Sequence, residues 1–295
     1  CASTWITRSA WATGSPAWAC RSWTRPSRWC AARRLRAAGP LFRGPLSALS
    51  AVAARTPEDA ARFAAVGVPG GRIHLAGDMK FDRPLPPEPP FADRVRALAA
   101  GRPVLVGGSI AEEELDLAIS LPARLSGEGC APFLLLAPRR PEAWDEAARR
   151  AESAGLRVAR RSSPEDAGPA DVFLLDTIGE LASAYRLGDV ALLGGTFGKR
   201  GGHNVLEPLL AGIPVVLGPS TSNIRRTVEA AGKAVVEVTG PAEAARALAR
   251  LLLSPGARGE ACEAAGDLFA RHRGATRRTV RLALDLLDGR AGDRA

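Results

Sequence analysis

Short apolar runs and longer amphipathic segments alternate along the chain from about Leu35 onward. This alternation is typical of a parallel sheet whose strands are joined by helices, a doubly wound α/β fold. The predicted strands are LSAVAAR (49–55), RIHLAG (72–77), PVLVGG (103–108), PFLLLAP (132–138), LRVAR (156–160), DVFLL (171–175), VALLGG (190–195), PVVLG (214–218) and AVVEV (234–238). Helices are predicted from Pro57 and near 111–125, 141–154, 178–187, from 204, and near 223–231, 241–253 and roughly 256–287.

Proline and helix-capping residues refine this pattern. Five of the seven residues in the stretch 84–90 are proline, a composition that neither a helix nor a sheet interior tolerates. We interpret residues 84–90 as a linker between two domains, residues 36–83 and residues 91–295. Before the linker, Thr56 is suited to cap the helix that starts at Pro57.

The first 57 residues differ from the rest in composition. They contain nine arginines and no acid, so the net charge of +9 belongs to this end, which also holds five of the six tryptophans and three of the five cysteines. Basic residues interleaved with aromatics can bind single-stranded nucleic acid. The abrupt change and the absence of an initiator methionine favour a truncated or frame-shifted gene start instead. We therefore expect residues 1–35 to be anomalous and not native-like, and we expect no nucleic-acid partner.

Several classes of protein are excluded by missing patterns. No apolar run reaches the roughly 18 residues of a membrane span and no signal-peptide layout opens the chain, so a cytoplasmic protein is the default expectation. The cysteines lack metal-ligand or disulfide-framework spacing. No GxGxxG follows the first strand, and GxxxxGK[ST], GxSxG and HExxH do not occur, which argues against dinucleotide oxidoreductases, P-loop nucleotidases, hydrolases with a serine elbow and zinc proteases.

Unusual residues gather where predicted strands end, which is where ligands bind in doubly wound sheets. The densest stretch is GGTFGKRGGHNVLEP (194–208), with five glycines, two cations, a histidine and a helix start. Glycines permit positive φ angles and close approach of backbone N–H groups to a ligand, and a phosphate is the natural guest of a helix N-terminus. An alternative explanation for Asn204 and Glu207 is a capping box that only starts the helix. Capping leaves the glycines, Lys199, Arg200 and His203 unexplained.

Two further strand ends carry candidate ligands. Arg139 and Arg140 follow the strand 132–138, and a guanidinium offers a fork of donors matched to phosphate oxygens. Surface arginines are also commonly just solvated. The stretch Asp176 to Glu180 follows the strand 171–175, and Asp176 or Thr177 could simply cap the next helix.

Four ordered blocks carry a resemblance to a known family. The blocks are GDMKFDRP (77–84), LLLAPRRPE (134–142), DTIGELASAY (176–185) and GGTFGKRGGHNVLEPLLAGIPVVLGPSTSN (194–223). Over roughly residues 36–290 the chain resembles the 3-deoxy-D-manno-octulosonic acid (Kdo) transferases of lipopolysaccharide biosynthesis. GGHNxLEP followed by GIPVxxGP is the most specific part of this resemblance.

The resemblance implies a GT-B glycosyltransferase with a complete C-terminal Rossmann-like doubly wound domain and a partial N-terminal Rossmann-like domain. It implies that the C-terminal domain binds CMP-Kdo and that Kdo passes to a lipid A precursor with inversion and without a metal or cofactor. The implied setting is the cytoplasmic face of the inner membrane, whose surface the protein would meet through a missing N-terminal portion.

The resemblance also assigns roles to residues. It implies contacts to CMP from three stretches, namely Pro138 and Arg139; Ile178, Gly179 and Glu180; and Asn204, Val205, Leu206 and Glu207. Gly201, Gly202 and His203 would form a supporting loop around the third stretch. Lys80 matches a lysine expected to stabilise the charge that develops at the transition state.

Some positions depart from the family's pattern. The family's catalytic base is a glutamate near the start of its N-terminal domain, and a second functional glutamate lies further along that domain. This chain has no acid before Glu58, so both are absent. The loop at Ser109 is shorter and lacks the usual histidine, Arg140 stands where histidine is common, and Ile178 stands where methionine is more frequent. Two alternatives therefore stay open beside Kdo transfer: a catalytically incompetent nucleotide-binding fragment, and a GT-B transferase that uses another nucleotide sugar.

Overall fold

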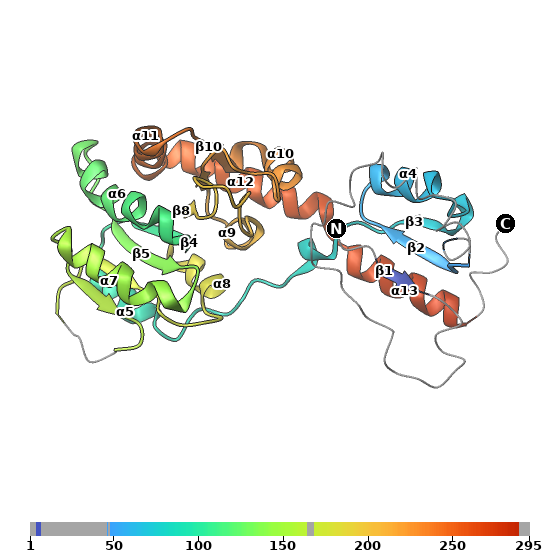
Figure 1. The fold of residues 1–295 in the computed structure, drawn as a ribbon, viewed down its shortest axis with the longest axis horizontal. Coiled ribbons are helices and arrows are strands. Elements are labelled where there is room, and N and C mark those ends of the chain that lie inside the picture. The colour runs from blue at the N-terminus through green and yellow to red at the C-terminus, as the bar shows by residue number, and fades with distance from the viewer. Residues whose placement is uncertain (1–3, 7–45, 47, 164–167, 289–295) are drawn as a thin grey trace. The chain divides into compact units, whose positions relative to one another are not determined.

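The computed structural model describes residues 4–6, 46, 48–163 and 168–288. The chain divides into two compact units, one formed by Cys1–Arg83 with Arg271–Ala295 and the other by Pro84–Ala270 (Figure 1). The division falls between Arg83 and Pro84, at the start of the proline-rich stretch that we interpret as a linker. Among the described residues, none of the helices combines the length and apolarity needed to span a bilayer.

The larger unit is built on one seven-stranded sheet with the order β10-β9-β8-β4-β5-β7-β6, in which every neighbouring pair is parallel. Its strands are β4 (Val104–Ile110), β5 (Phe133–Pro138), β6 (Val158–Arg160), β7 (Val172–Leu174), β8 (Val190–Leu193), β9 (Val215–Leu217) and β10 (Val235–Glu237). The order reverses beside β4, as in doubly wound folds. The α/β class predicted from the alternating pattern is confirmed.

Helices precede, connect and follow these strands and cover both faces of the sheet. They are α5 (Ala92–Ala99), α6 (Leu115–Gly127), α7 (Trp144–Ser153), α8 (Leu181–Ala184), α9 (Leu206–Leu210), α10 (Arg225–Ala231), α11 (Pro241–Leu253) and α12 (Pro255–His272). Figure 1 shows α6 and α7, in green, beside β5.

The core explains why these strands read as continuous apolar runs. Leu105, Leu134 and Leu192 point to one face and are packed in a single cluster with the buried residues of α6, α7 and α11. On the opposite face, the ring of Phe91 at the start of α5 stacks on Phe173 with the ring centroids 5.4 Å apart. Strands β5, β7, β8 and β9 are buried at every residue, whereas the edge strands β6 and β10 are only partly buried. Parallel strands that are covered on both faces have continuous apolar sequences without an apolar-polar alternation.

The smaller unit contains a three-stranded sheet with the order β1-β2-β3. Strands β2 (Ala51–Ala54) and β3 (Ile73–Leu75) are parallel and are connected through α4 (Pro57–Ala65). The side chain of Thr56 accepts the N–H of Asp59 at 3.1 Å, which confirms the predicted cap. Strand β1 (Thr4–Ile6) pairs antiparallel with β2, although no element was predicted there; the rest of residues 1–35 lies outside the described residues.

The C-terminal part of the chain corrects the prediction of one helix over 256–287. The structure has α12 and a separate helix α13 (Ala275–Leu287), with the break at Gly274, whose φ is 90°. The Asp82 carboxylate, from a distant part of the sequence, accepts the N–H groups of Gly274 at 2.6 Å and Thr276 at 2.5 Å and so starts a new helix. Burial raises the pKa of Asp82, but these backbone donors outweigh burial and hold the pKa below its ordinary value.

Helix α13 also differs from the predicted domain boundary, because it groups with the smaller unit rather than with residues 91–270. Its Leu282 and Leu286 pack in one buried cluster with Ala51, Ala53 and Ala76. The apolar face of α13 is therefore buried against the β2 strand and the residue that follows β3.

An arginine-rich junction at the amino ends of the strands gives a pH-dependent prediction. Asp171 accepts two bonds of 2.8 Å from Arg157 and one of 3.3 Å from Arg102. The bonds from Arg157 are the main cause that lowers the pKa of Asp171 from 3.8 to about 2. A carboxyl group whose pKa is depressed on folding stabilises the fold above its unfolded pKa, and this stability is lost as the pH falls through its folded pKa.

We expect Asp171→Asn to lower the free energy of unfolding at pH 7 by about 2 kcal/mol. The deficit relative to the unmodified chain should shrink as the pH falls from about 4 to about 2, as urea titrations at several pH values would measure. Asp93→Asn, at a fully exposed carboxylate on α5, is the matched control with an expected change below about 0.5 kcal/mol. A deficit of the same size at pH 2 and pH 7 would contradict the electrostatic origin.

Candidate functional site

The candidate site lies along one edge of the seven-stranded sheet. Because all its strands are parallel, the loops that follow β4, β5, β7 and β8 leave the sheet at the same edge, together with the loop after β9. Ligands of doubly wound folds bind at this carboxyl edge, near the point where the strand order reverses. Strand β4 is that point here, with β8 on one side and β5 on the other.

The glycine-rich loop (residues 194–202) follows β8 and folds back on itself. Its Gly202 N–H donates to the carbonyl of Gly195 at 2.8 Å, which closes the loop. Gly195, Gly201 and Gly202 have φ angles of 74°, 80° and 87°, in the left-handed region that favours glycine. Three of the five glycines are thus required by backbone conformation.

Gly194 is required for a different reason, the crossing of two backbones. A Cβ at this position would lie 2.2 Å from the carbonyl oxygen of Ser109. Ser109 itself has a φ of 53°, where the register of β4 against β5 shifts. The end of β4 and the start of the glycine-rich loop are therefore in direct contact, and the Gly194 N–H donates to the Gly108 carbonyl at 2.9 Å.

The side chain of Glu114 accepts hydrogen bonds from two backbone N–H groups of the glycine-rich loop. The residue is only 2% exposed, and its carboxylate accepts the N–H groups of Ala111 at 3.0 Å, Gly195 at 2.6 Å and Phe197 at 2.8 Å. We did not predict a role for Glu114 from the sequence. A signal was present, because Glu114 shares a helical face with Ala118, Leu121 and Leu125, all of them buried.

Other contacts fasten the outer side of the same loop. Arg200 Nε donates to Glu113 at 2.8 Å, and this bond is the main cause that holds the pKa of Glu113 below its ordinary value. From the loop after β9, Ser220 Oγ accepts the Gly201 N–H at 3.1 Å and Asn223 Nδ2 donates to the Arg200 carbonyl at 2.7 Å. The amides of Gly194, Gly195, Phe197, Gly201 and Gly202 are therefore engaged within the protein.

The two arginines after β5 are exposed at the carboxyl edge. The Arg139 N–H donates to the Ile110 carbonyl at 2.8 Å, which fixes the backbone of Arg139 to the end of β4. Its charge acts on His203, the residue that follows the glycine-rich loop: burial first and the Arg139 charge second lower the pKa of His203. Arg140 acts likewise on Glu113, whose pKa its charge helps to lower.

His203 lies against the glycine-rich loop. A Cβ on Gly195 would lie 2.7 Å from His203 Nε2, so the imidazole packs directly on the Gly195 backbone. The Nε2 atom is buried without a hydrogen-bond partner. Because the pKa of His203 is lowered, a neutral imidazole is expected at pH 7.

The predicted start of a helix at residue 204 is shifted by two residues. Helix α9 begins at Leu206, and Asn204 Oδ1 accepts the Leu206 N–H at 3.2 Å. Asn204 Nδ2 donates to Glu207 Oε1 at 2.8 Å. The predicted capping box is wrong, because the N-cap residue is Val205 and the Glu207 carboxylate accepts from the amide side chain of Asn204. Val205 and Leu206 are buried, whereas Asn204 is exposed and Glu207 half-buried.

The loop after β7 contains one structural acid and one exposed apolar side chain. Asp176 is buried and accepts the N–H of Ser162 at 2.9 Å and its hydroxyl at 2.6 Å, so it joins two loops. Ile178 is 80% exposed, and Gly179 has a φ of 90°. Glu180 accepts hydrogen bonds from Thr177 and from Arg161.

The remaining predicted residues lie in separate places. Pro138 is buried as the last residue of β5, next to Arg139. Lys80 is exposed and belongs to the smaller unit, in the turn Met79–Asp82, where its N–H donates to Asp78 Oδ1 at 3.1 Å.

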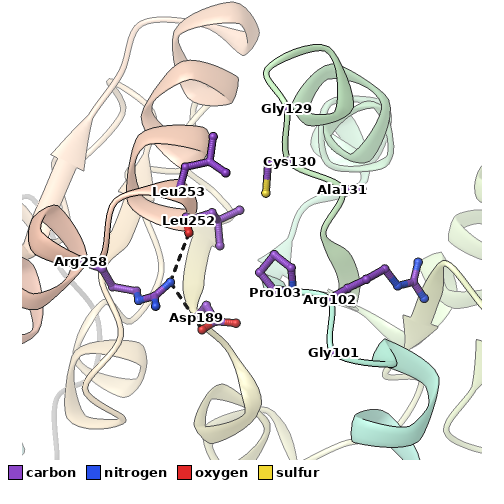
Figure 2. Close-up of a pocket in the computed structure, with 10 residues that line it drawn as sticks. All are labelled: Gly101, Arg102, Pro103, Gly129, Cys130, Ala131, Asp189, Leu252, Leu253 and Arg258. Carbon is purple, nitrogen blue, oxygen red and sulfur yellow. Dashed lines mark hydrogen bonds and ion pairs between the residues drawn. The ribbon is translucent and has the colours of Figure 1, made fainter.

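A hollow of about 460 Å³ lies at the opposite edge of the larger unit's sheet (Figure 2). It is bordered by residues 101–103 and 129–131, which precede β4 and β5, and by Asp189, which precedes β8. Figure 2 shows Arg258 directed to the Leu252 carbonyl at 3.4 Å and to Asp189 at 3.8 Å. These are the amino ends of the strands, so the hollow is separate from the candidate site at the carboxyl edge.

Sequence comparisons relate the chain to a family of transferases. A family profile described as 3-deoxy-D-manno-octulosonic-acid transferase (kdotransferase) matches residues 27–83. A 3-deoxy-D-manno-octulosonic acid transferase of Bordetella pertussis is 38% identical over 250 residues, and one of Haemophilus influenzae is 32% identical over 250 residues. Each alignment covers 82% of this chain and 58% of the relative, so the chain spans little more than half the length of these relatives.

Among solved structures, one similar domain supports the same relation and a second structure shares the fold. The C-terminal CMP-Kdo binding domain of WaaA from Acinetobacter baumannii matches with a TM-score of 0.55 and 26% identity, over 60% of this chain and 95% of that domain. HepE of Anabaena, in complex with UDP and glucose, matches with a TM-score of 0.51 and 15% identity, over 87% of this chain and 67% of HepE. The second likeness concerns the fold alone.

Proposed function

The chain is related to the 3-deoxy-D-manno-octulosonic acid (Kdo) transferases over most of its length, and we propose that it acts as a glycosyltransferase whose larger unit binds CMP-Kdo. The observation that carries the proposal is the convergence of Arg139, the glycine-rich loop and Asn204 with Glu207 at the carboxyl edge of one parallel sheet. The likeness to the CMP-Kdo binding domain of WaaA supports this choice of donor.

Each part of the edge suits one part of the nucleotide. The exposed guanidinium of Arg139 offers a fork of charged donors for the phosphate. The Glu207 carboxylate can accept hydrogen bonds from ribose hydroxyls, with Asn204 beside it. Ile178 offers an exposed apolar surface for the base, next to Gly179 and Glu180. Val205 and Leu206 anchor the third stretch through burial, as Pro138 anchors the first.

The glycine-rich loop would shape this site without providing the main phosphate ligand. The amides of Gly195 and Phe197 already bind Glu114, and the amides of Gly201 and Gly202 already bind Ser220 and Gly195. Binding of a phosphate therefore depends on Arg139 and on the polar start of α9 more than on the amides of the glycine-rich loop.

For the transfer itself, we propose that Kdo passes to a lipid A precursor with inversion at the anomeric carbon and without a metal. CMP is the leaving group, and an ammonium such as that of Lys80 stabilises the negative charge that develops on its phosphate. In the family, an early glutamate acts as the general base. This chain has no acid before Glu58 that could take this role. The proposed setting is the cytoplasmic face of the inner membrane, where the acceptor lipid lies.

The donor is tested by ligand-dependent thermal stability. We expect CMP at about a hundredfold its Kd to stabilise the larger unit by about 2.7 kcal/mol, because a ligand that binds only the folded state shifts unfolding by mass action. This corresponds to an increase in Tm of about 5 to 10 °C for a unit of this size. UDP at the same concentration should give a much smaller shift. A shift by UDP equal to that by CMP would favour a transferase for another nucleotide sugar.

Transfer is measured separately, with CMP-Kdo and a lipid A precursor as substrates. Release of CMP that depends on the acceptor would support the transferase. Binding of CMP without such release would mean that the chain binds the nucleotide and does not catalyse transfer, which is the alternative left open by the absence of an early acid.

A further inference from the structure

Three backbone donors converge on the side chain of one buried acid. One oxygen of Glu114 accepts the N–H groups of Ala111 and Gly195, and the other accepts that of Phe197, at 3.0, 2.6 and 2.8 Å. Concave groups of backbone N–H donors are the arrangement with which proteins hold phosphate and other anions. Here the anion is the Glu114 carboxylate of the chain itself, in the 3₁₀ turn that precedes α6.

We propose that Glu114 is a positioning residue for donor binding, a built-in anion that fixes the glycine-rich loop before the nucleotide enters. The proposal rests on the proposed function, since it takes this loop as a border of the nucleotide site. Fixing Gly195 also fixes the far end of the loop, because the Gly195 carbonyl accepts the Gly202 N–H and the His203 ring packs on the Gly195 backbone.

The glycine content of the glycine-rich loop explains why the loop needs a residue that fixes its conformation. Five glycines give the unfolded loop more conformational freedom than other residues would, so ordering the loop has a large entropic cost. Hydrogen bonds from N–H groups to a carboxylate are about twice as strong as those between neutral groups. If the loop is already ordered before the ligand binds, the binding free energy is not reduced by the entropic cost of ordering the loop.

The neighbouring acids allow a matched comparison. Glu112, Glu113 and Glu114 are consecutive in one 3₁₀ turn, yet only Glu114 is buried. Glu113 pairs on the outside of the loop with Arg200, whereas Glu112 is exposed. Glu112→Gln therefore changes the charge by the same amount in the same turn, without touching the amides of the glycine-rich loop.

The main test uses the 295-residue chain with Glu114→Gln, which keeps the size of the side chain but turns an NH₂ group toward backbone donors. Hydrogen exchange of the ligand-free chain should be at least about tenfold faster in peptides covering 194–203, and unchanged over β5. Calorimetric titration should show CMP binding weakened at least about tenfold. Glu112→Gln should behave like the unmodified chain in both measurements.

A second variant separates positioning from simple packing. Glu114→Ala removes the anion and leaves the three donors facing a cavity that a formate ion can enter. Added formate should restore slow exchange in the glycine-rich loop and most of the CMP affinity, and should change neither quantity in the unmodified chain. If Glu114→Ala does not fold, Glu114→Gln decides alone.

Unchanged loop exchange in Glu114→Gln would overturn the proposal, and so would faster exchange with unaltered CMP affinity. Failure of formate to rescue a folded Glu114→Ala chain would also overturn it. If the unmodified chain binds no CMP, it is the proposed function that fails, and loop exchange in the ligand-free chain still decides whether Glu114 fixes the loop.

Discussion

Replacement of Gly108 by alanine is expected to lower the free energy of unfolding of the larger unit by about 3 kcal/mol or more. A Cβ at Gly108 would lie 1.8 Å from the hydroxyl oxygen of Tyr185 and 2.6 Å from its Cζ, far inside contact distance. Tyr185, the first residue of the 3₁₀ turn that follows α8, is only 1% exposed, so its ring has little room to move. Overpacking of a rigid core forces side chains off their rotamers and displaces backbone.

Two further variants make the test of Gly108 specific. Gly127→Ala, at the last residue of α6 with no atom within 4 Å of the added Cβ, should be neutral or slightly stabilising, because alanine favours a helix. Tyr185→Phe removes the hydroxyl that the new Cβ would meet, so the double variant Gly108→Ala with Tyr185→Phe should recover part of the loss. Strictly additive effects of the two changes in urea titrations would contradict the proposed clash.

The architecture of the larger unit was readable from the sequence because its signals are local. The apolar runs predicted near 103–108 and 132–138 correspond to β4 at Val104–Ile110 and β5 at Phe133–Pro138. Strands that are buried on both faces carry continuous apolar sequence, and the turns between them carry caps and glycines. A parallel arrangement then follows from the helices between the strands.

The features that sequence reasoning missed depend on partners far along the chain. The break between α12 and α13 is fixed by Asp82, which lies 192 residues from Gly274. Glu114 finds its loop partner 81 residues away at Gly195. Hydrophobic periodicity can place Glu114 on a buried face, but it cannot tell which donors will meet a buried carboxylate.

The glycines illustrate how a motif can be recognised for a reason that turns out to be incomplete. We expected close approach of backbone N–H groups to a ligand, whereas the structure engages the amides of Gly194, Gly195, Gly201 and Gly202 within the protein. Positive φ angles at three of these four residues and the close crossing at Gly194 are sufficient physical reasons for glycine. This leaves the guanidinium of Arg139 as the main candidate to neutralise a bound phosphate.

The second large effect is therefore expected for Arg139→Ala, which should weaken CMP binding by about tenfold to a hundredfold. A hydrogen bond between charged groups contributes roughly 1.5 to 3 kcal/mol, which corresponds to this range of Kd. Because Arg139 is exposed, the free energy of unfolding without ligand should change by less than about 0.5 kcal/mol. Calorimetric titrations with CMP and denaturation without ligand measure the two quantities.

Cytidine, which lacks the phosphate, is the control ligand that distinguishes a contact to the phosphate from a contact to the nucleoside. If Arg139 binds the phosphate, Arg139→Ala should leave the Kd of cytidine nearly unchanged, and CMP should lose most of its advantage over cytidine. Arg149→Ala, at a 71% exposed arginine on α7, removes the same charge and should alter neither Kd. Equal weakening of CMP and cytidine by Arg139→Ala would mean that the side chain supports the loop or contacts the nucleoside, and the phosphate would then have to be bound elsewhere along the carboxyl edge.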